Sequence, residues 1–388
     1  MLGRVVRRGR LLSVAVYRVL ALFAVALAAA VVFAGPAAAV EPQARTPALQ
    51  FLGQAIIPTG ATFAGTEVGG LSSITYDPSR NVYYVLSDDC SQINPARFYT
   101  FRIGLDGSFD ASDLHVDGVT TLQAPAGGPY PPFSLDPEGL ALTKDGRLVL
   151  TSEGDTGRLI DPFVRLYDLQ GGLLGSLPVP APFLPTADHS SGVRNNLAFE
   201  AAAVAPNGRF FFTGTENALF QDGPAATVAN GSPSRLLRYD LQTGRLAREY
   251  LYVTDPIAVP PVPATAFAVN GLVELLPLNN EFMLAMERSF SVGIPGTGNK
   301  IKLYRVALPG ADDVKFLDSL AGSLGSIRPA QKTLLLDLGS LGIPLDNVEG
   351  MTLGPDLPDG PRSLVMVSDN NFAASQFTQF LLFAVSPG

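Results

Sequence analysis

Acidic residues recur at two fixed positions of a segment that the chain repeats. The first position directly precedes an apolar run and holds Glu138, Glu200 and Glu349, with Gly69 and Asn270 in the other two copies. The second position lies where the following apolar run ends, and its members are Asp88 and Asp89, Glu153 with Asp155, Glu216, Glu287, and Asp369 with Asn370 and Asn371. Several carboxylates in a small space cannot all stay ionised and unpaired. They must bind a cation, meet Arg or Lys, or hold protons.

The residue types favour a hard cation over a transition metal. Carboxylate and amide oxygens suit Ca²⁺, whereas a chain with only two histidines disfavours a histidine-rich zinc site. Arg288 directly follows Glu287 and offers a cationic partner, while Arg158, Arg165 and Arg238 flank later apolar runs. The alternative is that each acidic residue caps a turn or strand through a backbone N–H of its own segment.

Nucleophilic hydrolase machinery has little support in the sequence. No G-x-S-x-G elbow occurs. The run 188–190 contains Asp, His and Ser, but neighbours in sequence cannot form the relay of a catalytic triad. Dinucleotide-binding and P-loop patterns are also absent from the sequence.

The repeat predicts the fold that must position these residues. Its five copies open at Gly70, Gly139, Ala201, Gly271 and Gly350, spaced 62 to 79 residues apart. A four-stranded propeller blade needs roughly 40 to 50 residues, and longer repeats place the excess in loops. The sequence therefore predicts an all-β β-propeller of five or six blades. Residues 49–57 read as a strand outside the copies and would complete the last blade beside 377–385, which closes the ring.

Turn chemistry supports this prediction. Asp145-Gly146 and Asn207-Gly208 separate consecutive apolar runs and supply the positive φ that short hairpins need. Because adjacent strands are antiparallel, the start of one and the end of the next share a rim. Both acidic positions should therefore meet at one end of the central channel.

Residues 1–39 predict a secretory signal peptide, and 40–388 a single domain. Five arginines and no acidic residue precede an apolar stretch from Val19 to Ala34, and Ala37-Ala38-Ala39 offers a small-residue cleavage site before Val40. The alternative is a retained membrane anchor.

Without those five arginines the formal net charge of −8 becomes −13. Such a body repels nucleic acid and anionic membranes, and would accept a polyphosphate only through bound metal. We expect a secreted periplasmic or extracellular monomer, with no internal disulfide because Cys90 is the one cysteine.

Five stretches resemble the phytase-like family, which is described as having esterase-like activity. They are DPEGLALTKDGRLVLTSEGD (136–155), NLAFEAAAVAPNGR (196–209), MERSFSVGIPGTGNKIKLYRVAL (286–308), NVEGMTLGPDLPDGPRSLVMVSDNNF (347–372) and GGLSSITYD (69–77). The resemblance implies a β-propeller and hydrolysis of an ester or phosphate ester. The family's acidic and Arg positions correspond here to Glu138, Glu153, Glu200, Glu287, Arg288, Glu349, Asp369 and Asn370. Ala201-Ala202 departs from the Gly-Leu that usually follows the Glu.

These observations lead to one functional hypothesis and two alternatives. The hypothesis is a secreted esterase or phosphoesterase acting on a small molecule at a Ca²⁺-assisted acidic site in the propeller mouth. The expected catalytic residues are Glu138, Glu200, Glu287, Arg288 and Glu349. The expected metal ligands are Glu138, Glu153, Glu200, Glu349, Asp369 and Asn370. The alternatives are a non-catalytic ligand- or partner-binding propeller with structural calcium, and a lactonase-like hydrolase.

Overall fold

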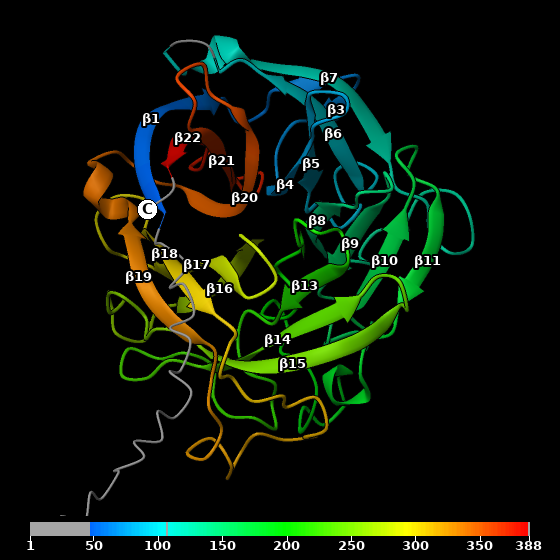
Figure 1. The fold of residues 1–388 in the computed structure, drawn as a ribbon, viewed down its shortest axis with the longest axis vertical. Coiled ribbons are helices and arrows are strands. Elements are labelled where there is room, and N and C mark those ends of the chain that lie inside the picture. Colours follow the sequence, from blue (N-terminus) through cyan, green and yellow to red (C-terminus); the bar gives the residue numbers. More distant parts are fainter. Residues whose placement is uncertain (1–46, 106–107, 387–388) are drawn as a thin grey trace, which may run out of the picture. The chain divides into compact units, whose positions relative to one another are not determined.

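Five four-stranded antiparallel sheets form a ring in the computed structural model, which describes residues 47–105 and 108–386. The chain divides into the units Met1–Gln43 and Ala44–Gly388, and the described residues belong to the second. Figure 1 shows the sheets as the blades of a β-propeller around a central channel. The expected signal peptide, residues 1–39, lies outside the described residues.

Blades 1 to 4 follow the chain order, from an inner strand at the channel to an outer strand at the edge. Blade 1 contains β4 (Leu71–Asp77), β5 (Val82–Ser87), β6 (Arg97–Ile103) and β7 (Leu114–Thr121). Blade 2 contains β8 (Pro137–Leu142), β9 (Leu148–Ser152), β10 (Phe163–Tyr167) and β11 (Leu173–Leu177). Blade 3 contains β12 (Ala203–Val204), β13 (Phe210–Gly214), β14 (Pro233–Asp240) and β15 (Arg245–Val253). Blade 4 contains β16 (Ala268–Pro277), β17 (Phe282–Ser291), β18 (Asn299–Ala307) and β19 (Gln331–Asp337).

Blade 5 combines the two ends of the described chain. It contains β20 (Asn347–Asp356), β21 (Arg362–Asp369) and β22 (Thr378–Ser386), with β1 (Ala48–Ile57) as its outer strand. β1 pairs with β22 from Ala48↔Ser386 to Ile57↔Thr378. This pairing satisfies an edge that would otherwise stay open. The prediction of an N-terminal closing strand is confirmed.

The blade count is five, because the long segment between β18 and β19 forms no blade of its own. Residues 308–330 contain no strand and pack against blade 3. Val314 and Leu320 form a small apolar cluster with Leu251 there, and the Ala330 N–H donates to the Leu251 carbonyl at 2.8 Å. The excess length of this repeat is therefore a loop, as the repeat spacing predicts.

The apolar core is divided among the interfaces between neighbouring blades. One cluster, for example, joins Leu236 and Tyr252 of blade 3 to Leu272 and Met283 of blade 4. Four comparable clusters fill the other interfaces. Both faces of a blade are thus covered, which explains why second strands such as β9 (LVLTS) are buried at every position rather than alternating.

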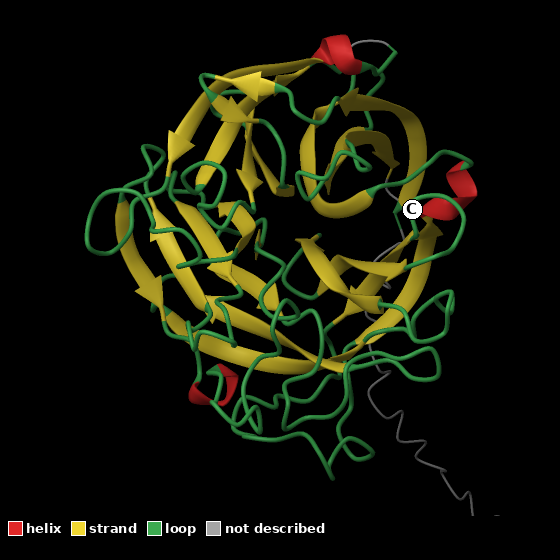
Figure 2. Cartoon of the chain, turned by 180° about the vertical axis from the view of Figure 1, so that it is seen from behind, coloured by secondary structure: helices red, strands yellow, loops and turns green. Residues whose placement is uncertain are grey.

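Helical structure in the described chain is limited to three short 3₁₀ turns (Figure 2). They are η1 (Ala111–Asp113), η2 (Ala181–Phe183) and η3 (Leu338–Leu341), and a small hairpin of β2 (Thr62–Phe63) and β3 (Thr66–Glu67) lies outside the blades. Within the described ranges, no helix combines the length and the apolar character needed to cross a membrane.

Candidate functional site

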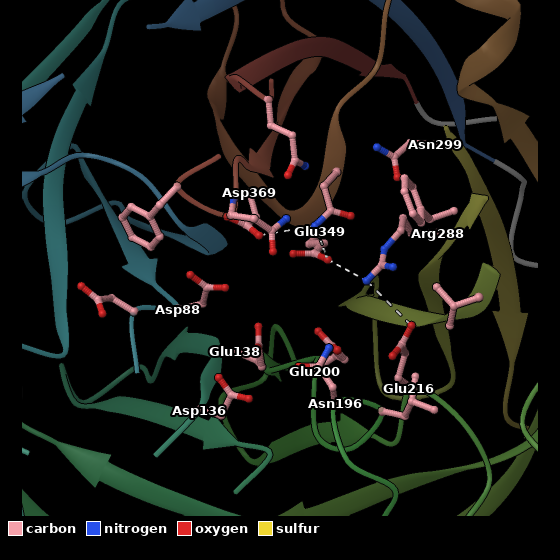
Figure 3. A pocket seen from close by; sticks show the side chains of 18 of the residues that line it. Asp88, Asp136, Glu138, Asn196, Glu200, Glu216, Arg288, Asn299, Glu349 and Asp369 are labelled. Atoms are coloured by element: carbon pink, nitrogen blue, oxygen red, sulfur yellow. Dashed lines mark hydrogen bonds and ion pairs between the residues drawn. The ribbon is translucent and has the colours of Figure 1, made fainter. Parts of the chain in front are cut away.

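A pocket of about 830 Å³ opens where the inner strands begin, at one end of the channel. Figure 3 shows carboxylates from several blades converging on it, together with Arg288. The acidic lining residues are Asp88, Asp89, Asp136, Glu138, Glu200, Glu216, Glu349 and Asp369. Arg288 is the one Lys or Arg among the described residues that line it.

Strand register explains which side chains face this pocket. At the exit of each second strand, one residue pairs with the beginning of the inner strand, as in Asp369↔Asn347 and Arg288↔Gly271. In blades 1, 2 and 3 the equivalent residues are Asp88, Glu153 and Glu216. Their N–H groups donate to the carbonyl oxygens of Gly70, Asp136 and Ala198, respectively. The five equivalent exit residues are therefore Asp88, Glu153, Glu216, Arg288 and Asp369. In blade 4 this position belongs to Arg288, and Glu287 lies one residue earlier.

A bulge at the start of every inner strand aims the first acidic position into the mouth. In blade 5 the register shifts between Val348 and Gly350, which leaves Glu349 as the extra residue. Glu138 and Gly139 lie in the corresponding shift of blade 2, and Glu200 lies between the isolated bridge at Phe199 and β12 in blade 3. Bulges commonly re-aim side chains beside active sites. Blades 1 and 4 place the uncharged Ser72 and Val273 here.

On one side of the pocket, which we call the arginine side, two carboxylates share one arginine. It comprises Arg288, Glu216 and Glu349. Arg288 Nη2 lies 2.8 Å from Glu349 Oε1 and 3.8 Å from Glu216 Oε1. Burial alone would lower the pKa of Arg288, but Glu349 and Glu216 raise it. Burial raises the pKa of Glu216 to about 7 even though Arg288 opposes the shift.

On the other side, which we call the acidic side, carboxylates meet without a cation among the described residues. It comprises Asp88, Asp136 and Glu138 of the lining, together with Glu153, which is buried next to Asp136 and Glu138 and is not a lining residue. One oxygen each from Asp136, Glu138 and Glu153 lie within 4.8 Å of one another. Burial and then the neighbouring carboxylates raise the pKa of Glu138, Glu153 and Asp88 well above their usual values.

Hydrogen bonding separates the acidic residues further. Glu153 is 2 % exposed, its Oε1 accepts from the Ala198 N–H, and its Oε2 is buried with no hydrogen-bond partner in the described chain. Asp136 accepts from the Cys90 thiol at 2.9 Å. The alternative that all acidic residues are backbone caps fits Asp89, which accepts from the N–H groups of residues 92, 93 and 94. It does not fit Glu153 Oε2.

Glu287 lies outside the pocket, in a polar network between blades 3 and 4. Tyr252 donates to Glu287 Oε1 at 2.8 Å, and Lys332 forms ion pairs with Glu287 and Asp255. The Asp255 N–H donates to Glu287 Oε2 at 2.7 Å. A one-residue offset along a strand reverses the side chain's face, so Glu287 and Arg288 cannot both face the mouth. The structure gives Glu287 a structural environment rather than a pocket-facing one.

The remaining expected ligands differ in what they touch. Asp369 lines the pocket, accepts from the Asn371 N–H at 2.6 Å, and has its pKa raised to about 8 by burial and by Glu349. Asn370 lies outside the lining. Its Oδ1 accepts from the N–H groups of Gly70 and Phe372 at 2.9 and 3.1 Å. That oxygen is thus already engaged in holding a loop.

Sequence reasoning missed Asp136, which lies among the carboxylates of the acidic side. The signal was present, because Asp136 precedes Glu138 by two residues and side chains two apart in a strand share a face. The sequence places Glu216 among the exit residues but does not predict it as a site residue. In the structure its side chain packs against Gly271, and a Cβ on Gly271 would come within 2.2 Å of that side chain. A glycine that makes room for a charged residue is visible only in the structure.

A further buried carboxyl, Glu274, lies deeper along the channel. It follows the bulge of blade 4 at the position that Gly139, Ala201 and Gly350 occupy in blades 2, 3 and 5. Its Oε1 accepts from the N–H groups of Leu275 and Ala202 at 2.8 and 3.4 Å. The small residues at this position in blades 2, 3 and 5 thus leave room for the Glu274 carboxyl, which links the inner strands of blades 3 and 4.

The remaining sequence candidates lie away from the pocket. Ser190 Oγ donates to Asp188 at 2.8 Å in an exposed loop, and His189 packs near Phe220. No triad geometry links them. Arg158 pairs with Asp155, Arg165 lies over the Phe163 ring, and Arg238 lies over the Phe210 ring.

Comparison with solved structures returns other proteins with low similarity. The Dos1 propeller has 5 % identity and a TM-score of 0.34, over 81 % of this chain and 68 % of that one. The tail fiber of Staphylococcus aureus phage P68 has 11 % identity and a TM-score of 0.40, over 88 % and 53 %. The Pseudomonas aeruginosa periplasmic gluconolactonase PpgL has 12 % identity and a TM-score of 0.34, over 82 % and 86 %.

Sequence comparison is more informative. An uncharacterized secreted protein of Arthroderma benhamiae is 22 % identical over 184 residues, which are 40 % of this chain and 35 % of that relative. The chain therefore spans about a third of the length of this curated relative. A family model described as "Phytase-like: Esterase-like activity of phytase" matches residues 66–372, which include all five inner strands and both sides of the pocket. The chain belongs to this phytase-like family.

Proposed function

We propose that the protein is a secreted hydrolase that cleaves an ester or a phosphate ester in the acidic pocket, with a divalent cation, Ca²⁺, on the acidic side. Family membership supports hydrolysis. The observation that carries the proposal is the unequal charge balance of the pocket, where Arg288 compensates one side and nothing in the described chain compensates the other.

The residues on the acidic side fit a calcium ion. Oxygens on opposite sides of Ca²⁺ lie roughly 4.6–5.2 Å apart, since each is 2.3–2.6 Å from the ion. The oxygens of Asp136, Glu138 and Glu153 all lie within 4.8 Å of one another. The buried, unpartnered Glu153 Oε2 is a group whose burial is costly unless it is neutralised. These three residues would hold the cation, and Asp136 and Glu138 line the pocket, as does Asp88.

A cation held there would polarise the ester carbonyl or phosphoryl group and make water more acidic. The chain's own residues supply the rest of the chemistry. Glu200 lines the pocket, and burial followed by the nearby Glu153 and Glu216 raises its pKa well above the usual value. A carboxylate with a raised pKa is suited to accept a proton from attacking water. Arg288 would donate to the oxyanion that develops on the substrate.

A substrate panel with a chelator tests the proposal. Purified protein is assayed on an aryl ester, an aryl phosphate, phytate and a lactone, with and without a calcium chelator. We expect the protein to turn over at least one ester class. The chelator should abolish this turnover, and added calcium should restore it. Glu200→Gln should lower kcat about 10²-fold or more, because it removes the general base.

Asp145→Asn is the matched control, because Asp145 pairs with Arg147 in an exposed hairpin turn. It should leave activity unchanged. Calcium binding without turnover on any of the four classes would instead favour the non-catalytic propeller with structural calcium. Lactone-only turnover would favour the lactonase-like alternative.

Secretion is part of the proposal and rests on residues 1–39, supported by the relative that is named as secreted. Mature protein from the native host should begin at or near Val40. N-terminal sequencing that finds Met1 retained in membranes would reject this part of the proposal.

A further inference from the structure

Apolar side chains also line the pocket, beside its carboxylates. Ile93, Phe267, Phe290 and Phe372 line the same pocket as the acidic residues. Phe267 is 64 % exposed and Ile93 is 51 % exposed. Ile93 and Phe372 come from loops of blades 1 and 5, whereas in blade 4 Phe267 directly precedes β16 and Phe290 lies in β17. Exposed aromatic and aliphatic groups at the edge of a polar pocket are typical contacts for the apolar part of a ligand.

Blade 4 presents a built apolar surface at this edge. The rings of Phe267 and Phe290 pack with centroids 6.1 Å apart and planes tilted by 40°. The Val292 N–H donates to the Phe267 carbonyl at 3.0 Å, and the Val262 N–H donates to the Val292 carbonyl at 2.9 Å. Val262 and Val292 are themselves exposed, so the apolar surface continues outward from the pocket.

Blade 5 contributes Phe372 in a strained backbone conformation. Its φ is +52°, in the left-handed region that bulky residues rarely adopt. The Phe372 N–H donates to Asn370 Oδ1, and a Cβ on Gly70 would lie 2.6 Å from the Phe372 ring. The ring therefore lies directly against the Gly69-Gly70 backbone. Strain that neighbouring groups maintain in this way concentrates at functional sites.

The pocket's charge restricts what can enter beside these apolar side chains. Eight carboxylates and one arginine line it, so a single divalent cation leaves its interior acidic. A polyphosphate would bring several further negative charges into a pocket that these carboxylates already line, and like charges repel one another at short range. An uncharged ester meets no such repulsion.

We infer that the substrate is an uncharged carboxylic ester with an apolar acyl or alcohol part, which Phe267, Phe290 and Ile93 bind. This inference rests on the proposed hydrolytic function and narrows it to one ester class. In the reaction, the oxygen of water bonds to the acyl carbon and the bond from that carbon to the alcohol oxygen breaks. The alcohol leaves with one proton of the water and the carboxylic acid keeps the other.

The first experiment compares kcat/KM for 4-nitrophenyl acetate, butyrate and octanoate with that for 4-nitrophenyl phosphate and phytate. We expect kcat/KM to rise about two- to fourfold per added methylene, as for partial to full burial of that group. Phe267→Ala should flatten this gradient and raise KM for octanoate about tenfold. Phe316→Ala is the matched control, since Phe316 is 85 % exposed and lies outside the lining.

A second measurement separates the inference from the proposed function. The chain contains no tryptophan, so Phe267→Trp places a single reporter in the pocket lining and Phe316→Trp one away from it. 4-Nitrophenyl butyl ether, which cannot be hydrolysed as an ester, should quench the fluorescence of the first variant saturably and leave the second unchanged.

The outcomes are distinct. Turnover without a chain-length gradient, preference for phosphate or phytate, or equal effects of Phe267→Ala and Phe316→Ala would overturn the inference and leave hydrolysis standing. Saturable quenching at Phe267→Trp without turnover of any ester would support the apolar binding surface and reject the hydrolytic function. Neither quenching nor turnover would overturn both.

Discussion

The arginine side and the acidic side of the pocket contain the same kind of residue in different electrostatic states. Glu216 and Glu349 meet Arg288, whose Nη2 lies 2.8 Å from Glu349 Oε1. One oxygen each of Asp136, Glu138 and Glu153 lies within 4.8 Å of the others, but these residues meet no Lys or Arg among the described residues that line the pocket. The difference arises in blade 4, where the exit position holds an arginine instead of an acid.

This comparison shows that burial of a carboxylate is not by itself a sign of function. Glu287 is as buried as Glu153, but Tyr252, Lys332 and the Asp255 N–H satisfy its carboxylate. Glu153 keeps one buried oxygen without a partner in the described chain. The informative quantity is the uncompensated charge, because an unpaired buried charge destabilises the fold until something neutralises it.

Removing Arg288 should produce the largest effect. Arg288→Ala leaves Glu216 and Glu349 buried without a cation, which should lower the free energy of unfolding by about 3–5 kcal/mol. Urea denaturation at neutral pH measures the loss. Arg158→Ala is the control, because the Arg158–Asp155 pair has side chains 55 % and 25 % exposed and should cost only about 0–1 kcal/mol. Equal effects of the two variants would show that the arginine side is not electrostatically balanced by Arg288.

Neutralising one carboxylate on each side should have opposite effects on the metal-free protein. Glu138→Gln removes repulsion on the acidic side and should stabilise the chelator-treated protein by about 1 kcal/mol. Glu349→Gln removes the closest partner of Arg288 and should destabilise the chelator-treated protein by a similar amount. Thermal denaturation with chelator measures both. Shifts of the same sign would contradict the division of the pocket into two sides.

The stability of the metal-free protein should fall as pH rises. Burial raises the pKa of Glu216 from 4.5 to about 7 and that of Asp369 from 3.8 to about 8. Between these values the two groups hold more protons in the folded protein than in the unfolded chain. The stability that they contribute is therefore fully present below about pH 4 and is lost as pH rises through 7 and 8. Urea denaturation with chelator at pH 5, 6.5 and 8 checks the direction. A stability that increases steadily with pH would contradict it.

Much of the fold could be predicted from the sequence because each blade repeats the same local signals. Small residues, hairpin turns such as Asp145-Gly146, and buried second strands mark five copies, and the strand 49–57 had no partner within them. The number of blades was less certain, since residues 308–330 are long enough to suggest another unit. Only the packing of Val314 and Leu320 on Leu251 shows that they form a loop.

The site was less predictable because a one-residue register decides what faces the channel. Glu287 and Arg288 are adjacent, and the repeat alone did not show which of them takes the exit position. The first acidic position was easier, since a Glu precedes a small residue in three copies. The bulge that aims these residues inward depends on pairing between strands, which the sequence does not display.

Calcium titration of chelator-treated protein tests the central claim most directly, namely that a cation belongs on the acidic side. Isothermal calorimetry at pH 7.5 should show saturable binding, and the melting temperature should rise with calcium by mass action on the folded state. Glu138→Gln and Glu153→Gln should each weaken the binding, whereas Asp145→Asn should not. Absence of binding up to millimolar calcium, with the melting temperature unchanged, would contradict the account and leave the acidic side without its proposed cation.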